Sequence, residues 1–213
     1  MHSSGWGTGI KKTLRASEQD RADVRQRRDS WSAAQPTLDV SRLVFLDESS
    51  AKTNMTRRYG RSVQGSRCHD HAPHGHWCTT TMISSIRLDG TTACMAIEGA
   101  LDKRVFREYV RHVLVPTLRR GDIVIMDNLS AHTDGEALRL IEQAQASACF
   151  LPPYSPDFNP IEKMWSKIKA FLRATKVRTH RGLYQAIGTA LETVTPEDAK
   201  GWFRSCGYAA AQA

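Results

Sequence analysis

The chain has 213 residues, of which 40% are hydrophobic, so it is long enough and apolar enough to fold around one sizeable core. Lys and Arg outnumber Asp and Glu by 30 to 22, and the resulting net charge of +8 favours a polyanionic partner. The first residues contain no apolar segment of a secretory signal, and no apolar run approaches the roughly 18 residues of a membrane span. The five cysteines are an odd number scattered along the chain. We therefore expect a cytoplasmic protein with reduced thiols and no membrane partner.

The segment 1–38 differs from the rest of the chain because it is basic and poor in apolar residues. Ser17 is followed by acidic residues, a pattern that begins a helix. Only Val24 and Trp31 give this helix an apolar side, so we expect an arm that lies on a surface and takes no part in the core. The compact domain is predicted over 39–207.

Hydrophobic periodicity over 39–207 predicts strands and helices in a defined order. Strands are expected at 42–46, 77–88, 91–97, 123–126 and 148–151, and helices at 103–115, 136–145, 161–173, 183–194 and 196–203. The polar stretch after the first strand is expected to be a loop or irregular hairpin. Asp89-Gly90 is a hairpin signal, so the first three strands form an antiparallel meander. Such a meander followed by alternating helices and strands predicts an α/β mixed sheet flanked by helices, the layout of the ribonuclease H-like fold.

Three acidic residues occupy positions that core packing does not explain. Asp47 follows the apolar run 43–46, Asp127 follows the run 123–126, and Glu162 opens a helix. Ligands bind at the C-terminal ends of strands in open α/β sheets, and hard divalent cations prefer carboxylate oxygens. We therefore expect Asp47, Asp127 and Glu162 to be catalytic and to hold Mg²⁺ or Mn²⁺, two ions per site, with Asp47 bridging both.

Each acid also has a purely structural interpretation. Asp47 could be a turn residue at the end of a strand, and Asp127 with Asn128 could form an Asx turn. Glu162 lies three residues after Asn159, the pattern of a capping box in which Asn159 is the N-cap. A cap contributes about 1 kcal/mol but does not account for the unusual sequence before it.

Residues next to the acids are candidates for supporting roles. Glu48 competes with Asp47, but it points to the opposite face of the strand, so we expect it to bind a basic neighbour or solvent. Asp157 is the alternative ligand to Glu162. Asn128 and His132 are assigned to the surroundings of the metals, and for His132 the alternative is a residue that merely begins the next helix.

Basic side chains near the predicted site are candidates for phosphate contacts. Lys169 and Arg173 share a helical face with Glu162. Arg57, Arg58 and Arg61 follow the first strand. The alternative is an ordinary solvated surface.

The sequences around the three acids resemble the catalytic core of DDE transposases. They are Leu46-Asp47-Glu48, Met126-Asp127-Asn128-Leu-Ser-Ala-His132 and Pro152-Pro-Tyr-Ser-Pro-Asp-Phe-Asn-Pro-Ile-Glu162. The third is long and unusual in composition, so it is a specific signal, and the spacing from Asp127 to Glu162 also fits. Over roughly residues 10–205 the chain is similar to the IS630 branch of the Tc1/mariner superfamily.

This resemblance implies a metal-dependent DNA endonuclease and strand transferase. Water as nucleophile would cut double-stranded DNA at element ends, and the freed 3′-hydroxyl would join them to target DNA, at TA dinucleotides. It further implies a homodimer in the active complex and a nucleoid-associated place in a bacterial cytoplasm. The helix-turn-helix modules that such transposases carry upstream are not seen here. The chain therefore resembles the downstream half of a split gene or a truncated copy, with an upstream-frame product as an expected partner. The alternatives are a catalytically inactive DNA-binding remnant and a standalone ribonuclease H-like nuclease.

One segment suggests a different metal. The stretch 68–78 is rich in Cys and His, but its spacing matches no standard zinc site. Related transposases have a similar Pro-His-Gly-His-Trp stretch that leads into the second strand, which is the interpretation we adopt.

Overall fold

The computed structural model describes residues 16–75 and 77–208, so Lys11, Lys12 and Arg15 of the predicted arm lie outside the described residues. Its centre is a five-stranded sheet in the order β3-β2-β1-β4-β5. The strands are β1 (Leu43–Lys52), β2 (Thr79–Ile86), β3 (Thr92–Glu98), β4 (Ile123–Met126) and β5 (Ser147–Phe150). β1, β2 and β3 are antiparallel neighbours, whereas β4 runs parallel to β1 and β5 runs parallel to β4. The predicted meander and mixed sheet are therefore confirmed.

β1 is longer than predicted and carries Asp47 in its interior. The strand continues because residues 47–52, although mostly polar, pair with β2. Asp47 is therefore not at a strand end, as the sequence suggested, while Asp127 does follow the last residue of β4. Phe45 pairs with Ile125, and continuing this register by two residues brings Asp47 opposite Asp127. Adjacent strands lie about 4.8 Å apart, so the sheet itself brings the first two acids together.

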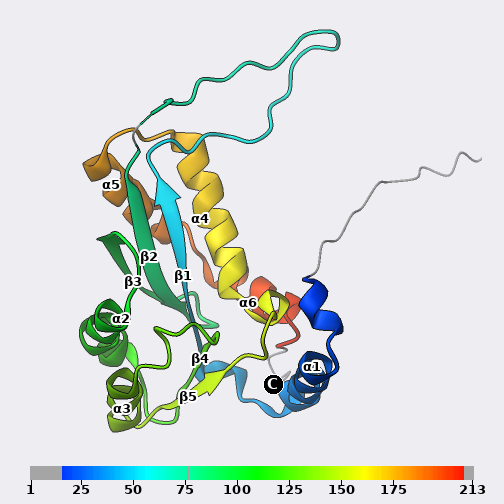
Figure 1. Ribbon diagram of the computed structural model, residues 1–213, viewed down its shortest axis with the longest axis vertical. Coiled ribbons are helices and arrows are strands. Elements are labelled where there is room, and N and C mark those ends of the chain that lie inside the picture. Colours follow the sequence, from blue (N-terminus) through cyan, green and yellow to red (C-terminus); the bar gives the residue numbers. More distant parts are fainter. Residues whose placement is uncertain (1–15, 76, 209–213) are drawn as a thin grey trace, which may run out of the picture.

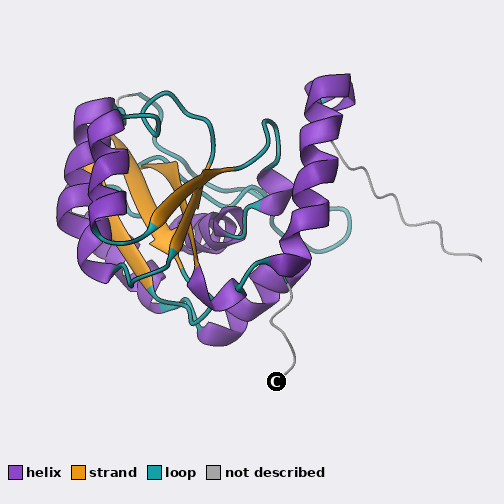
Figure 2. Cartoon of the chain, turned by 90° about the horizontal axis from the view of Figure 1, so that it is seen from below, coloured by secondary structure: helices purple, strands orange, loops and turns teal. Residues whose placement is uncertain are grey.

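Helices cover both faces of the sheet (Figures 1 and 2). One face packs against α2 (Lys103–Tyr109) and α3 (Gly135–Gln143), and the other against α4 (Ile161–Thr175), α5 (His180–Glu192) and α6 (Pro196–Ser205). The run Leu43–Leu46 is fully buried because its side chains alternate between these two cores. None of the helices within the described residues is long and apolar enough to span a bilayer.

The helix predicted over 103–115 changes type along its length. α2 ends at Tyr109, a π-helical turn follows over Val110–Leu114, and a 3₁₀ turn covers Val115–Thr117. Pro116 has no backbone N–H and therefore cannot continue a regular α-helical ladder.

α1 (Ala22–Ala34) follows a short 3₁₀ turn, Ser17–Asp20, and so begins later than expected. It lies beside α6 at the end of the domain where the described chain ends (Figure 1). Val24 is its buried residue. Trp31 Nε1 donates a hydrogen bond to the Tyr208 hydroxyl over 3.0 Å. α1 therefore lies on the surface of the domain. It is held there by the buried Val24, by packing of Trp31 against the core and by the hydrogen bond to Tyr208.

The polar stretch between β1 and β2 projects far from the sheet as a long loop (Figure 1). Within its described part, 53–75 and 77–78, no strand forms, so of the two predicted possibilities the loop is confirmed.

Candidate active site

Asp47, Asp127 and Glu162 line one pocket of 460 Å³. They come from the middle of β1, the residue after β4 and the first turn of α4, so the fold unites positions that are far apart in the chain. Asn128, Asn159 and the loop over 151–156 complete the wall. The three acids that the sequence singled out are therefore brought together.

Asp47 is the most buried of the three acids, with 8% of its surface exposed. Its Oδ1 accepts a hydrogen bond from the Glu48 backbone N–H (2.8 Å), and its Oδ2 accepts one from Asn159 Nδ2 (3.2 Å). Burial, followed by repulsion from Glu162 and Glu48, raises the pKa of Asp47 to about 8. A carboxylate in such a position is stabilised by any cation that enters the pocket.

His132 is fully buried between two carboxylates. Its Nδ1 lies 2.7 Å from Asp127 Oδ1, and its Nε2 lies 3.3 Å from Glu48 Oε2. Burial alone would lower the pKa of His132, but the bonds to Asp127 and Glu48 outweigh it and raise the pKa to about 9. The imidazolium therefore donates to Asp127 at neutral pH. His132 does not begin α3, whose N-cap is Asp134, and Glu48 meets a basic neighbour on the opposite face from Asp47, as expected.

Asp127 both forms an Asx turn and lines the pocket. Its Oδ1 accepts the Leu129 backbone N–H (3.0 Å) as well as the His132 ring. Partial burial would raise the pKa of Asp127, but these two hydrogen bonds prevail and lower it. Among the described residues its Oδ2 accepts no hydrogen bond. This oxygen is thus available to a ligand in the pocket.

The structural alternative for Glu162, a capping box with Asn159 as N-cap, does not form. α4 begins at Ile161, the residue before it is Pro160, and no side chain caps the helix. Asn159 instead is 4% exposed and donates to Asp47. A hydrogen bond to a carboxylate is stronger than one to a neutral partner, so the buried acid takes the Asn159 side chain away from the helix end.

Glu162 itself faces the pocket from the first turn of α4. Partial burial raises its pKa; Lys169 opposes this shift, and the neighbouring carboxylates of Asp127 and Glu48 reinforce it. The alternative ligand Asp157 does not line the pocket. It forms an ion pair with Arg28 at 2.7 Å.

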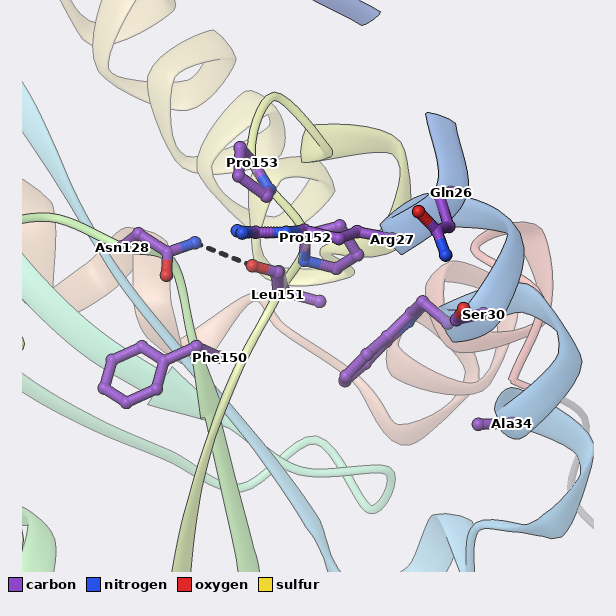
Figure 3. Close-up of a pocket in the computed structure, with 10 residues that line it drawn as sticks. Gln26, Arg27, Ser30, Ala34, Asn128, Phe150, Leu151, Pro152 and Pro153 are labelled. Atoms are coloured by element: carbon purple, nitrogen blue, oxygen red, sulfur yellow. Dashed lines mark hydrogen bonds between the residues drawn. The ribbon is translucent and has the colours of Figure 1, made fainter. Parts of the chain in front are cut away.

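Asn128 supports the site from the next position along the chain. Its Nδ2 donates to the Leu151 carbonyl over 2.7 Å, which ties the segment after β4 to the segment after β5 (Figure 3). The loop that leads to α4 is therefore anchored at its first residue.

Four of the five predicted phosphate-contact residues gather in two adjoining depressions that include α4 side chains, and Lys169 among them interacts with Glu162. Arg58, Lys169 and Arg173 line a single depression next to Lys52, and Arg57 joins Arg58 and Arg173 in an adjacent one. Partial burial lowers the pKa of Lys169, and Glu162 counters this most strongly. Arg61 lines neither depression and stands exposed in the projecting loop.

A family of nucleases matches this arrangement. The model for "DDE superfamily endonuclease" aligns with residues 42–183, which is most of the chain and includes all three acids. The chain belongs to the DDE superfamily endonuclease family. The predicted DDE transposase resemblance of Tc1/mariner type is confirmed, whereas its IS630 branch stays a prediction.

Individual relatives of this DDE protein include the Tcb1 transposase of Caenorhabditis briggsae, which is 24% identical over 102 residues. That alignment covers 46% of this chain and 37% of the relative. The transposase in the Mos1 paired-end complex with the left transposon end superposes on this chain with a TM-score of 0.72 and 14% sequence identity. The match covers 94% of this chain and 64% of the Mos1 chain. The transposase in the Mos1 strand transfer complex superposes with a TM-score of 0.71 and 15% sequence identity, over 94% of this chain and 62% of the Mos1 chain. The shared ribonuclease H-like fold is thus confirmed, and the chain spans less than two thirds of these relatives.

The donor set of this DDE pocket fits a divalent cation. Carboxylate oxygens are the ligands that Mg²⁺ prefers, and Mg²⁺ keeps several sites for water and phosphate. Within residues 16–75 and 77–208, no three His, Cys, Asp or Glu side chains lie close enough together to form the coordination shell of a metal ion without rearrangement. The three acids share one pocket as an open cluster. In the same described ranges Cys68 and Cys78 are exposed thiols, and no zinc-like group forms around them.

Proposed function

We propose that this chain is the catalytic domain of an insertion-sequence transposase, which cuts double-stranded DNA at element ends and joins them to target DNA. The observation that carries the proposal is the single pocket shared by Asp47, Asp127 and Glu162. Membership of the DDE superfamily endonucleases supports the same chemistry.

The three acids would hold Mg²⁺ or Mn²⁺, two ions per site, with Asp47 bridging them. Such ions activate the attacking oxygen and stabilise the leaving oxygen in phosphoryl transfer. The protein contributes orientation. His132 fixes one oxygen of Asp127 and leaves the other without a hydrogen bond from the described residues, while Asn159 and the Glu48 backbone N–H each hold one oxygen of Asp47.

Double-stranded DNA is the proposed partner. Arg58, Lys169 and Arg173 form a basic surface, which approaches the acids through Lys169 and would bind phosphates of the DNA that flanks a scissile bond. Contacts from these basic side chains to phosphates carry no sequence information, so the chain should bind DNA weakly, without sequence preference and with steep salt dependence. Sequence recognition is assigned to an upstream-frame product that carries a helix-turn-helix module, and the active complex to a homodimer.

A plasmid nicking assay tests the proposal. The wild-type chain should relax supercoiled DNA with MgCl₂ or MnCl₂ and lose this activity with EDTA. Asp127→Asn should abolish nicking while leaving the melting temperature nearly unchanged, because an amide oxygen can still accept from His132. Glu142→Gln is the matched control, since Glu142 is an exposed acid on α3 away from the pocket.

The outcomes separate the alternatives. Equal nicking by wild type and Asp127→Asn would remove the acids from the mechanism. DNA binding by the wild type without nicking, in either metal and with the upstream-frame product present, would favour the inactive remnant. Cleavage of RNA–DNA hybrids in preference to plasmid DNA would favour the standalone nuclease.

A further inference from the structure

The loop between β5 and α4 determines where two residues of the acid pocket lie. It carries Asn159, which bonds Asp47, and it leads directly to Glu162. The loop contains only one short 3₁₀ turn, Pro156–Phe158. Tyr154 has a left-handed backbone with φ of 55°, a conformation that is unfavourable for a residue with a side chain. This loop therefore needs support from elsewhere to keep its shape.

Arg28 of α1 supplies the first support. Its guanidinium donates to both oxygens of Asp157, at 2.9 and 2.7 Å, and to the Ser155 hydroxyl at 2.8 Å. It also lies 4.5 Å from the centre of the Phe158 ring. Planar two-point pairing of this kind fixes direction as well as distance. Only 18% of the Arg28 side chain is exposed, so the guanidinium donates mainly to the loop and little to solvent.

A second support holds the loop at the residue before Asn159. The Tyr208 hydroxyl donates to the Phe158 carbonyl over 2.9 Å and accepts from Trp31 Nε1 over 3.0 Å. Trp31 is on α1, so the same helix reaches the loop at two places. Gln19, just before α1, adds a hydrogen bond to the Tyr154 carbonyl over 2.6 Å.

Between these supports α1 and the loop do not pack tightly. A groove of 630 Å³ lies between them, lined by Gln26, Arg27 and Ser30 of α1 and by Pro152 and Pro153 of the loop (Figure 3). The hold of α1 on the loop therefore depends on the polar contacts and not on a continuous apolar interface.

We propose that Arg28 is a positioning residue, which acts from outside the family-matched region 42–183 to set the loop that presents Asn159 and Glu162 to the acid pocket. The inference rests on the proposed function for its kinetic consequence. Arg28 does not itself line the acid pocket, but its partner Ser155 does. A misplacement of about 1 Å at a reacting group can lower a rate by about a hundredfold. Loss of the support should therefore lower turnover without removing any group that touches DNA or metal.

The test compares two arginines of α1 in the full chain. Arg28→Ala removes the support, and Arg25→Ala is the matched control, because Arg25 is exposed and pairs only distantly with Asp20, at 3.9 Å. Both variants lose one positive charge from the same helix. We measure kcat for nicking, the Kd for DNA, and amide hydrogen exchange over 152–162.

Arg28→Ala should lower kcat by about 10- to 100-fold, leave the Kd within about threefold of the Arg25→Ala value, and speed exchange over 152–162. Arg25→Ala should change only the Kd. Arg28→Lys keeps the charge but not the two-point pairing, so it should restore kcat only in part. If Arg28→Ala does not fold, Asp157→Asn weakens the same pair from the loop side and should give the same pattern.

Equal effects of Arg28→Ala and Arg25→Ala on all three measurements would reduce Arg28 to a surface charge and overturn the proposal. Unchanged exchange over 152–162 in Arg28→Ala would also overturn it. If the wild type does not nick DNA, the proposed function fails, but the exchange comparison still decides whether Arg28 holds the loop.

Discussion

Replacing Asp47 by asparagine measures how far the acid pocket opposes folding when no cation is bound. Burial, then Glu162 and Glu48, raises the pKa of Asp47 from 3.8 to about 8. The folded chain therefore holds this proton more tightly than the unfolded chain does. The stability that this group contributes is complete below about pH 4 and is lost as the pH rises to about 8. Four pKa units correspond to about 5 kcal/mol.

The asparagine side chain has nearly the same shape and carries no charge at any of these pH values. Asn159 can adapt to it, because rotation of its amide turns the otherwise unpartnered Oδ1 toward the new donor. Urea denaturation in EDTA should give similar free energies of unfolding for both proteins at pH 4.5. At pH 8.5 Asp47→Asn should be the more stable, by up to about 5 kcal/mol.

Adding MgCl₂ at pH 8.5 should stabilise the wild type more than the variant, since the cation relieves the repulsion that asparagine has already removed. The contribution of His132 is common to both proteins and cancels in the difference. Parallel pH profiles for wild type and variant, with equal responses to MgCl₂, would refute the claim that Asp47 is held in an unfavourable environment.

Three further variants test other parts of the structure. His132→Ala should lower the free energy of unfolding at pH 7, because it removes a fully buried ring that packs against Phe106 and pairs with Asp127 and Glu48; an unchanged urea midpoint would contradict a structural role for the ring. The double variant Lys169→Ala, Arg173→Ala should weaken DNA binding and reduce the slope of log K against log salt by about one per lost phosphate contact, with little change in melting temperature; unchanged affinity would assign this surface to solvent. Asp122→Ala should lower stability by about 3–5 kcal/mol, because the buried Arg87 loses the carboxylate to which it is paired; a small effect in a thermal melt would show that water reaches Arg87.

The acid positions were predictable because an acid in an apolar environment is conspicuous. Nothing in packing explains a carboxylate directly after four apolar residues, so Asp47 and Asp127 could be selected from the sequence. The length of β1 could not, because residues 48–50 are polar and pairing with β2 is a long-range property. Local sequence thus located the acid but misjudged its place within the strand.

Asn159 shows why local rules fail near a reactive site. Asn followed by Pro and, three residues on, by Glu is a good helix start when judged locally. The structure gives Asn159 a buried carboxylate as partner instead. A buried Asp47 requires a hydrogen-bond donor for its side chain. A single sequence does not show which segment supplies that donor. The partners of Arg28 were hidden for the same reason, since they lie more than 120 residues further along the chain.

The link between Trp31 and Tyr208 closes a loop of 177 residues, and the bond from Gln35 to the Cys206 carbonyl closes one of 171. Contacts between residues so far apart in the sequence form slowly, because the chain loses conformational entropy before the contact stabilises it. During synthesis Trp31 and Gln35 therefore leave the ribosome well before the partners that they bond. An unfinished chain that ends before Tyr208 already contains all three acids but lacks the contact that holds the loop before Glu162. We expect amide hydrogen exchange over 152–162 to be faster in a fragment that ends before Tyr208 than in the full chain, because the Phe158 carbonyl has lost the hydroxyl that donates to it.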